Sequence, residues 1–151
     1  MTDTALIGIL HPVVITRDFA GARHFYEDVL GFVSRPVTTH DPDKIARLGG
    51  PPDTVARAVI LHAPDGSELE IAAFERPAGK AQSTAGWADA GIRSITFKVS
   101  SIIAMLDRLA ANGYRQVNDV VEFAVEGKPV QVAYAHGPDG VILTLLQEGK
   151  L

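Results

Sequence analysis

The sequence contains no cysteine. A disulfide framework, a thiolate metal ligand and a cysteine nucleophile are therefore excluded. Clustered positive charge is also missing, because the 14 Lys and Arg residues are scattered and the formal net charge is −4. A phosphate-backbone footprint and a polybasic membrane contact need such clusters. We therefore expect neither nucleic acid nor a membrane as a partner.

No apolar run approaches the length of a membrane span, and the first ten residues lack the positively charged start of a signal peptide. What the chain does have is a hydrophobic fraction of 46% over 151 residues, which is enough to bury the core of one ordinary domain. We expect a cytoplasmic protein with a single domain over residues 1–151.

The stretch from residue 11 to residue 32 predicts a strand followed by a helix. Residues 11–16 are rich in β-branched side chains, which favour strands. Asp18 is suited to cap the following helix and Gly31 to end it. Between these two positions, apolar residues recur at helical spacing and predict one buried face: Phe19, Ala22, Phe25, Tyr26, Val29 and Leu30.

The rest of the first half predicts a small sheet. Residues 33–38 form a short extended segment whose proline suits a sheet edge, and 40–53 is a surface excursion with one helical turn. Residues 56–62 and 68–74 are two strands joined by a tight Pro-Asp-Gly turn at 64–66, which makes a hairpin.

The second half repeats this order after a segment rich in Pro, Gly, Ser and Ala at 76–90. It predicts a strand at 92–99, a helix that begins after Ser101 and ends at Gly113, and strand-like runs at 114–124, 130–136 and 141–147, with a second Pro-Asp-Gly turn at 138–140. A unit that occurs twice is a duplication rather than a repeat array. The predicted organisation is two βαβββ units, 6–75 and 91–148, joined by a linker at 76–90.

Several motifs in this order match a known family. They are His11, Arg17-Asp18, the run from Phe25 to Phe32, the run from Pro64 to Ile71, the run from Gly91 to Phe97, and Pro138-Asp-Gly140. Through them the chain resembles the vicinal oxygen chelate superfamily, which includes glyoxalase I, extradiol dioxygenases, methylmalonyl-CoA epimerase, and the fosfomycin and bleomycin resistance proteins. The resemblance implies an α+β fold in which two paired βαβββ units form a cup-shaped, partly open mixed sheet.

The same resemblance implies where a site would lie. The family's metal takes one ligand from the first strand and one from the last strand of each unit. In this sequence His11 and Glu70 stand at the two first-unit positions, whereas Ser94 and Thr144 stand at the two second-unit positions. Hydroxyl groups are poor ligands for iron, manganese, nickel or zinc. The resemblance therefore implies one weakly held divalent ion, or none, unless a group such as His136 is recruited as a further ligand.

Further candidates lie on the strands of both units. Ser94 and Thr144 are candidate substrate-binding groups, together with Tyr134, which shares strand parity with His136, and Lys98, whose charge would suit a carboxylate or phosphate. A purely structural interpretation is also open for the conspicuous residues. In it, His11 is a half-buried strand residue bonded to a backbone carbonyl, and Glu70 is a solvated member of an alternating strand.

Two functions from different classes follow from the resemblance. The first is a lyase or isomerase acting on a small molecule, in which Glu70 moves a proton next to a carbonyl and a metal or hydroxyl donors stabilise the enolate. The second is a metal-free binding protein of the bleomycin-resistance type. An extradiol dioxygenase is less favoured, because its iron needs two histidines and a carboxylate. We also expect a homodimer, because the arm at 75–90 with Trp87 has the composition of a segment that crosses to a neighbour.

Overall fold

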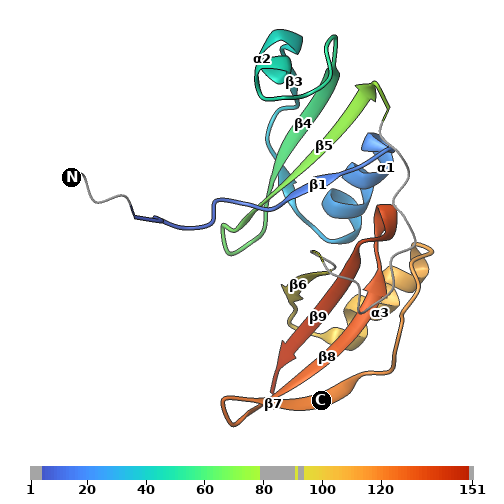
Figure 1. Ribbon diagram of the computed structural model, residues 1–151. Coiled ribbons are helices and arrows are strands. Elements are labelled where there is room, and N and C mark those ends of the chain that lie inside the picture. The colour runs from blue at the N-terminus through green and yellow to red at the C-terminus, as the bar shows by residue number, and fades with distance from the viewer. Residues whose placement is uncertain (1–4, 79–90, 92–93, 150–151) are drawn as a thin grey trace. The chain divides into compact units, whose positions relative to one another are not determined.

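The computed structural model describes residues 5–78, 91 and 94–149 (Figure 1). The chain divides into two compact units, 1–80 and 81–151. Each contains helix and one open mixed sheet, so the predicted α+β fold is confirmed. The predicted arm with Trp87 and most of the predicted linker at 76–90 lie outside the described residues.

The first unit is built on a five-stranded sheet. Its spatial order is β1-β5-β4-β2, with β3 also paired to β4; β1 runs parallel to β5 and the other pairs are antiparallel. The elements in chain order are β1 (Val13–Ile15), α1 (Phe19–His24), η1 (Phe25–Val29), β2 (Val33–Ser34), β3 (Thr38–His40), α2 (Pro42–Arg47), β4 (Val55–His62) and β5 (Glu68–Arg76).

The predicted first helix begins and ends where the sequence indicates. The Asp18 carboxylate accepts a hydrogen bond from the Gly21 N–H at 2.9 Å, and Gly31 has a φ of 85°, which glycine adopts without steric cost. Its second half, η1, is a π-helix rather than a continuation of the α-helix. There the Leu30 N–H bonds to the Phe25 carbonyl at 3.0 Å, one residue beyond α-helical spacing.

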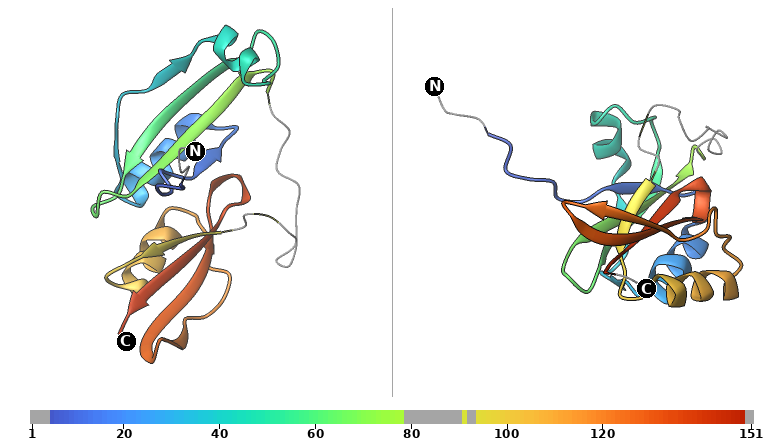
Figure 2. Two further views of the ribbon diagram at one scale, coloured as in Figure 1. Left: turned by 60° about the vertical axis from the view of Figure 1, so that its left-hand side comes forward. Right: turned by 90° about the horizontal axis from the view of Figure 1, so that it is seen from below.

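One face of this first sheet forms the core of the unit. Leu61 and Ile71 are fully buried on it, and Phe25 and Tyr26 from η1 are buried as well. The helical segment α1–η1 lies against this sheet (Figure 2). Because side chains alternate along a strand, the neighbouring residues of β4 and β5 belong to the opposite face.

The second unit repeats the topology with fewer elements. Its sheet has the order β6-β9-β8-β7, and its first strand again runs parallel to its last. The elements are β6 (Ser94–Lys98), α3 (Ile102–Ala111), β7 (Val121–Val125), β8 (Lys128–His136), η2 (Pro138–Gly140) and β9 (Ile142–Glu148). In both units the last strand pairs parallel with the first and antiparallel with the one before it. The predicted duplication is therefore present.

The core of the second unit lies between its sheet and α3. Leu143 and Leu145 of β9 are fully buried. Ile102 of α3 is also fully buried, and Leu109 of α3 is 1% exposed. The Ser101 hydroxyl accepts a hydrogen bond from the Ala104 N–H at 3.2 Å, which confirms it as the helix cap.

One predicted strand is shorter than expected. The run 114–124 forms a strand only as β7, while Gln116 makes an isolated bridge to Ala135. All five residues of β7 are exposed. No buried face therefore stabilises a longer strand that would begin before Val121. Along the part of the chain that the structure describes, no helix is long and apolar enough to cross a membrane.

Candidate functional site

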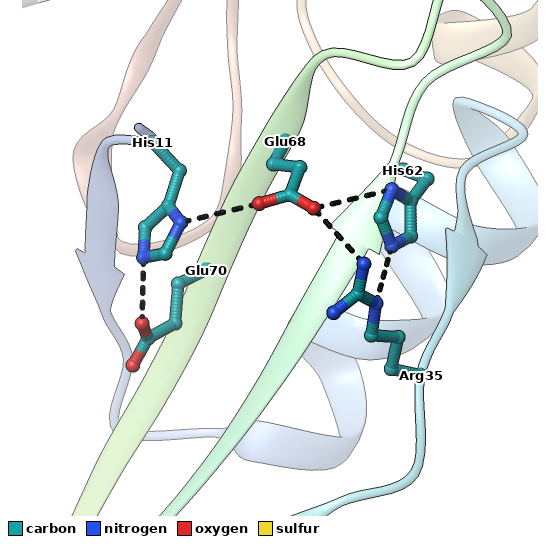
Figure 3. A network of polar contacts seen from close by, with 5 residues as sticks. All are labelled: His11, Arg35, His62, Glu68 and Glu70. Carbon is teal, nitrogen blue, oxygen red and sulfur yellow. Dashed lines mark hydrogen bonds and ion pairs between the residues drawn. The ribbon is translucent and has the colours of Figure 1, made fainter. Parts of the chain in front are cut away.

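The His11 and Glu70 side chains meet on the face of the first sheet opposite its core. The parallel pairing of β1 with β5 sets Val13 beside Glu70, and the Glu70 N–H donates to the Pro12 carbonyl at 3.0 Å. His11 Nε2 then lies 3.0 Å from Glu70 Oε2, with side chains 15% and 20% exposed (Figure 3). Strand parity predicts this juxtaposition from the sequence, and the structure shows it.

A second carboxylate approaches the other side of the same imidazole. Glu68 precedes Glu70 by two residues on β5 and therefore shares its face. Its Oε2 atom lies 3.5 Å from His11 Nδ1, and its Oε1 atom accepts a hydrogen bond from Arg35 Nη2 at 3.2 Å. Both ring nitrogens of His11 thus face carboxylate oxygens.

The Arg35 guanidinium also reaches His62. Arg35 Nε donates to His62 Nε2 at 2.7 Å, and His62 Nδ1 lies 3.6 Å from Glu68 Oε1. An arginine side chain only donates, so His62 Nε2 must be the acceptor and its proton must lie on Nδ1. A continuous chain of polar contacts therefore runs from Arg35 and His62 through Glu68 to His11 and Glu70, as Figure 3 shows.

Glu68, Arg35 and His62 were not identified as site residues from the sequence. The predicted hairpin could have indicated His62 and Glu68, because the turn at 64–66 pairs these two residues across the strands. Arg35 has no such signal. It follows the two-residue strand β2, and the bond from its N–H to the Ile60 carbonyl at 2.9 Å fixes its place beside β4.

The predicted substrate-binding residues lie in the second unit and share one face of its sheet. Tyr134 and Thr96 are both paired with Thr144, and Ser94 lies two residues before Thr96 on β6. Thr144 is 8% exposed. This face is opposite the row of buried residues that contains Leu143.

The two remaining candidates of the second unit are exposed. Lys98 Nζ lies 2.8 Å from Glu148 Oε1, and this hydrogen bond holds the pKa of the Glu148 carboxyl below its ordinary value. His136 is exposed at the end of β8, where its N–H donates to the Arg115 carbonyl at 2.9 Å.

Within each of the two units, the residues that the structure describes include no group of three or more His, Asp or Glu side chains arranged to hold an ion. His11 and Glu70 are a chemically suitable pair of donors, but resident metal sites normally use three or four protein ligands.

The family model for the Glyoxalase/Bleomycin resistance protein/Dioxygenase superfamily matches residues 8–145. The chain belongs to the glyoxalase superfamily. It has no significant match among curated proteins.

Solved structures of the glyoxalase superfamily share the fold. A glyoxalase family protein from Bacillus cereus is 22% identical, with a TM-score of 0.87 and 99% of both chains covered. One from Enterococcus faecalis is 23% identical, with a TM-score of 0.67, 93% of this chain and 97% of that chain covered. The trypanothione-dependent glyoxalase I of Leishmania major is 17% identical, with a TM-score of 0.63 over 91% of this chain and 84% of that chain. At these identities the likeness concerns the fold, and the activity has to be argued from the site.

Proposed function

We propose that this member of the glyoxalase superfamily is an enzyme of the lyase or isomerase kind that moves a proton next to a carbonyl group of a small molecule. The observation that carries the proposal is the His11–Glu70 contact of 3.0 Å between two side chains that are only 15% and 20% exposed. A histidine and a carboxylate in direct contact can pass a proton between them, which is what general acid–base catalysis requires.

The reaction needs two proton transfers at this site. The Glu70 carboxylate accepts the proton from the carbon beside the carbonyl, and the electron pair of that C–H bond forms the enolate. The proton is then returned to a different atom of the same substrate, so no oxidant or reductant is consumed. The His11 imidazole, held against Glu70, stabilises the carboxyl group in both of its protonation states by hydrogen bonding. Ser94, Thr144, Tyr134 and Lys98 remain proposed substrate-binding residues on the second unit.

The assay for this proposal is exchange of substrate protons for deuterium in heavy water, followed by NMR. The substrates tested are 2-oxo aldehyde hemithioacetals, acyl-thioesters and 2-oxo acids. Each of these carries an acidic C–H proton next to a carbonyl group. Exchange above the rate without protein supports the enzyme. No exchange with any member, together with tight binding of a large aromatic ligand, contradicts it.

One observation favours the alternative function of a binding protein that performs no chemistry. Val13 and Ile15 lie on the same face as His11 and Glu70 and are 49% and 52% exposed. Apolar side chains left half exposed beside a few polar groups are typical of ligand-binding surfaces. In this alternative the face sequesters an apolar ligand, and the polar contacts of His11 only orient it.

We expect divalent metal to bind weakly and to be lost easily. His11 and Glu70 leave most of the coordination sphere to water, so affinity for nickel, manganese and zinc should be low. Elemental analysis of protein purified without chelator, followed by titration with each metal, measures this. A stoichiometric, tightly held ion would contradict the expectation and would make His136 the first candidate for an additional ligand.

We also propose that the protein is a homodimer. The N-terminal segment 5–10 extends away from the start of β1 in Figure 1 and belongs to no strand. Each of its large apolar side chains is 79% or more exposed: Leu6, Ile7, Ile9 and Leu10. Such a segment gains stability when a neighbouring copy covers it. Light scattering or sedimentation at micromolar protein should give twice the monomer mass, and a clean monomer would contradict the proposal.

A further inference from the structure

The segment 5–10 overhangs the sheet of its own unit. The parallel register of β1 with β5 sets Val13 beside Glu70, and β5 begins at Glu68. Counted back from this register, residues 5–9 lie beyond the start of β5, past the point where the chain enters the turn from β4. The described strands of the first sheet therefore offer these residues no neighbouring strand to pair with.

The same segment has the side chains of a β-strand. From Ala5 to Leu10 it contains two leucines and two isoleucines and carries neither charge nor proline. Isoleucine favours strands, and side-chain alternation would put Ile7 and Ile9 on one face of an extended segment. All four large side chains are 79% or more exposed. An uncharged segment of this kind can add as a strand to the free edge of a sheet.

Strand β7 is the sheet edge that suits such a segment best. The edge strands β1, β2 and β3 have only two or three residues, whereas β6 and β7 have five each. β6 ends in Lys98, and three of its five residues are partly buried. Lysine and proline protect sheet edges, and β7 contains neither. Among the described strands β7 pairs only with β8, so its outer edge is open.

The side chains of β7 are also apolar on one face. Val121, Phe123 and Val125 alternate with Glu122 and Ala124, so the three larger apolar side chains point the same way. They are 41%, 53% and 52% exposed. A strand added outside β7 would place its own apolar side chains beside them as cross-strand neighbours, which stabilises a sheet.

The apolar area of these two surfaces is sufficient for a stable dimer. Burying a leucine or isoleucine side chain removes on the order of 100 Å² from water, so the four in segment 5–10 offer about 400 Å². The three half-exposed side chains of β7 add about 200 Å². In a two-fold dimer each copy supplies one segment and one edge, or about 600 Å² of apolar surface. A standard interface needs about 800 Å² per partner, of which just over half is apolar.

We infer that segment 5–10 of one copy adds as an extra strand to the outer edge of β7 in a second copy, and that this exchange occurs twice in a two-fold symmetric homodimer. The inference rests on the proposed homodimer and specifies its contact. Main-chain hydrogen bonds to β7 supply affinity, and the isoleucines beside Phe123 determine the register. Exchange in both directions leaves neither a segment nor a β7 edge to recruit a third copy.

Cross-linking between copies tests the contact directly. Because the chain has no cysteine, single thiols can be introduced where they are needed. Protein with Ile9→Cys is mixed with a size-tagged protein that carries Ala124→Cys, and a short bis-maleimide joins thiols on adjacent strands. We expect a mixed covalent dimer on a denaturing gel. The matched control replaces Ala124→Cys by Ile103→Cys on α3, where the side chain is 46% exposed, and should give no mixed product.

The dimer affinity should respond to the same two surfaces. Ile9→Asp and Val121→Asp should each raise the dimer Kd by about 10²-fold or more, because every substitution acts twice in a symmetric dimer. Ile103→Asp should leave the Kd unchanged. Hydrogen exchange of the β7 amides should become faster in Ile9→Asp, since their partner strand is lost. The contact does not enter a free energy of unfolding measured below the dimer Kd.

The outcomes separate this inference from the proposed homodimer. A wild-type dimer without the cross-link between positions 9 and 124 overturns the inference and leaves the homodimer standing. A monomer without the cross-link contradicts both. A protein that carries Ile9→Cys and Ala124→Cys together, and is cross-linked only within one copy while it stays a monomer, also overturns the inference, because the segment then covers the edge of its own chain.

Discussion

Glu70→Gln is expected to reduce turnover by about 10²-fold or more while leaving the fold and the ligand affinity nearly unchanged. The amide keeps the size of the side chain and one hydrogen bond to His11, but it cannot accept the substrate proton. The loss should therefore appear in kcat rather than in KM. Deuterium exchange followed by NMR measures it, with circular dichroism and ligand titration reporting on fold and affinity.

The control for this variant lies on the same strand. Glu75→Gln makes the same chemical change at the end of β5 where the carboxylate pairs with Arg57, and it should keep wild-type exchange. Exchange that survives Glu70→Gln would remove this residue from the mechanism. A sequestering protein, by contrast, would have no exchange to lose in either variant.

The largest expected effect on stability comes from Phe25→Ala. Phe25 is fully buried in η1 and packs edge-to-face on Tyr26, with ring centroids 5.0 Å apart. Removing the ring loses its burial and leaves a cavity between the helical segment and the sheet, so the free energy of unfolding should fall by about 3–5 kcal/mol. Urea unfolding monitored by circular dichroism measures the change.

Phe123→Ala is the matched control, because the same atoms are removed from a side chain of β7 that is 53% exposed. Away from a packed core the change should stay within about 0.5–1 kcal/mol. If the two variants lost similar stability, the face that carries Phe25 would not be the core of the first unit. An unfolding curve with two steps, of which Phe25→Ala shifts only one, would show that the unit 1–80 unfolds separately.

The helix caps and the two faces of β5 could be predicted from the sequence, because each has a local physical cause. Asp18 and Ser101 cap helices because short polar side chains accept the first free N–H groups, and both helices begin after them. The alternation of Leu69 and Ile71 with Glu68 and Glu70 separates the core from the polar face of β5 without any knowledge of the partner strands. The meeting of His11 with Glu70 follows from the same parity.

Features that depend on tertiary contacts could not be predicted from the sequence. Arg35 reaches Glu68 because β2 is short and lies beside β4, and neither fact has a local signature. The π-helical turn of η1 arises where Phe25, Tyr26 and Val29 are all buried, and an ordinary apolar stripe predicts an α-helix there. The early part of the run 114–124 has strand propensity, but propensity without a buried face does not extend β7.

The turn between β4 and β5 has a consequence for sequence change within this superfamily. In β5, Leu69 and Ile71 face the core, whereas Glu68 and Glu70 lie on the polar face. The register of β5 with β4 therefore determines both the packing of the core and the position of the two carboxylates. Exposed loop tips are usually sites where insertions are tolerated. If the length of the turn at 64–66 changed by one residue and the strand slipped with it, the carboxylates would turn inward and the leucine and isoleucine outward. Length variants of this turn should therefore persist in evolution only when the extra residues are looped out or the shift along the strand is even.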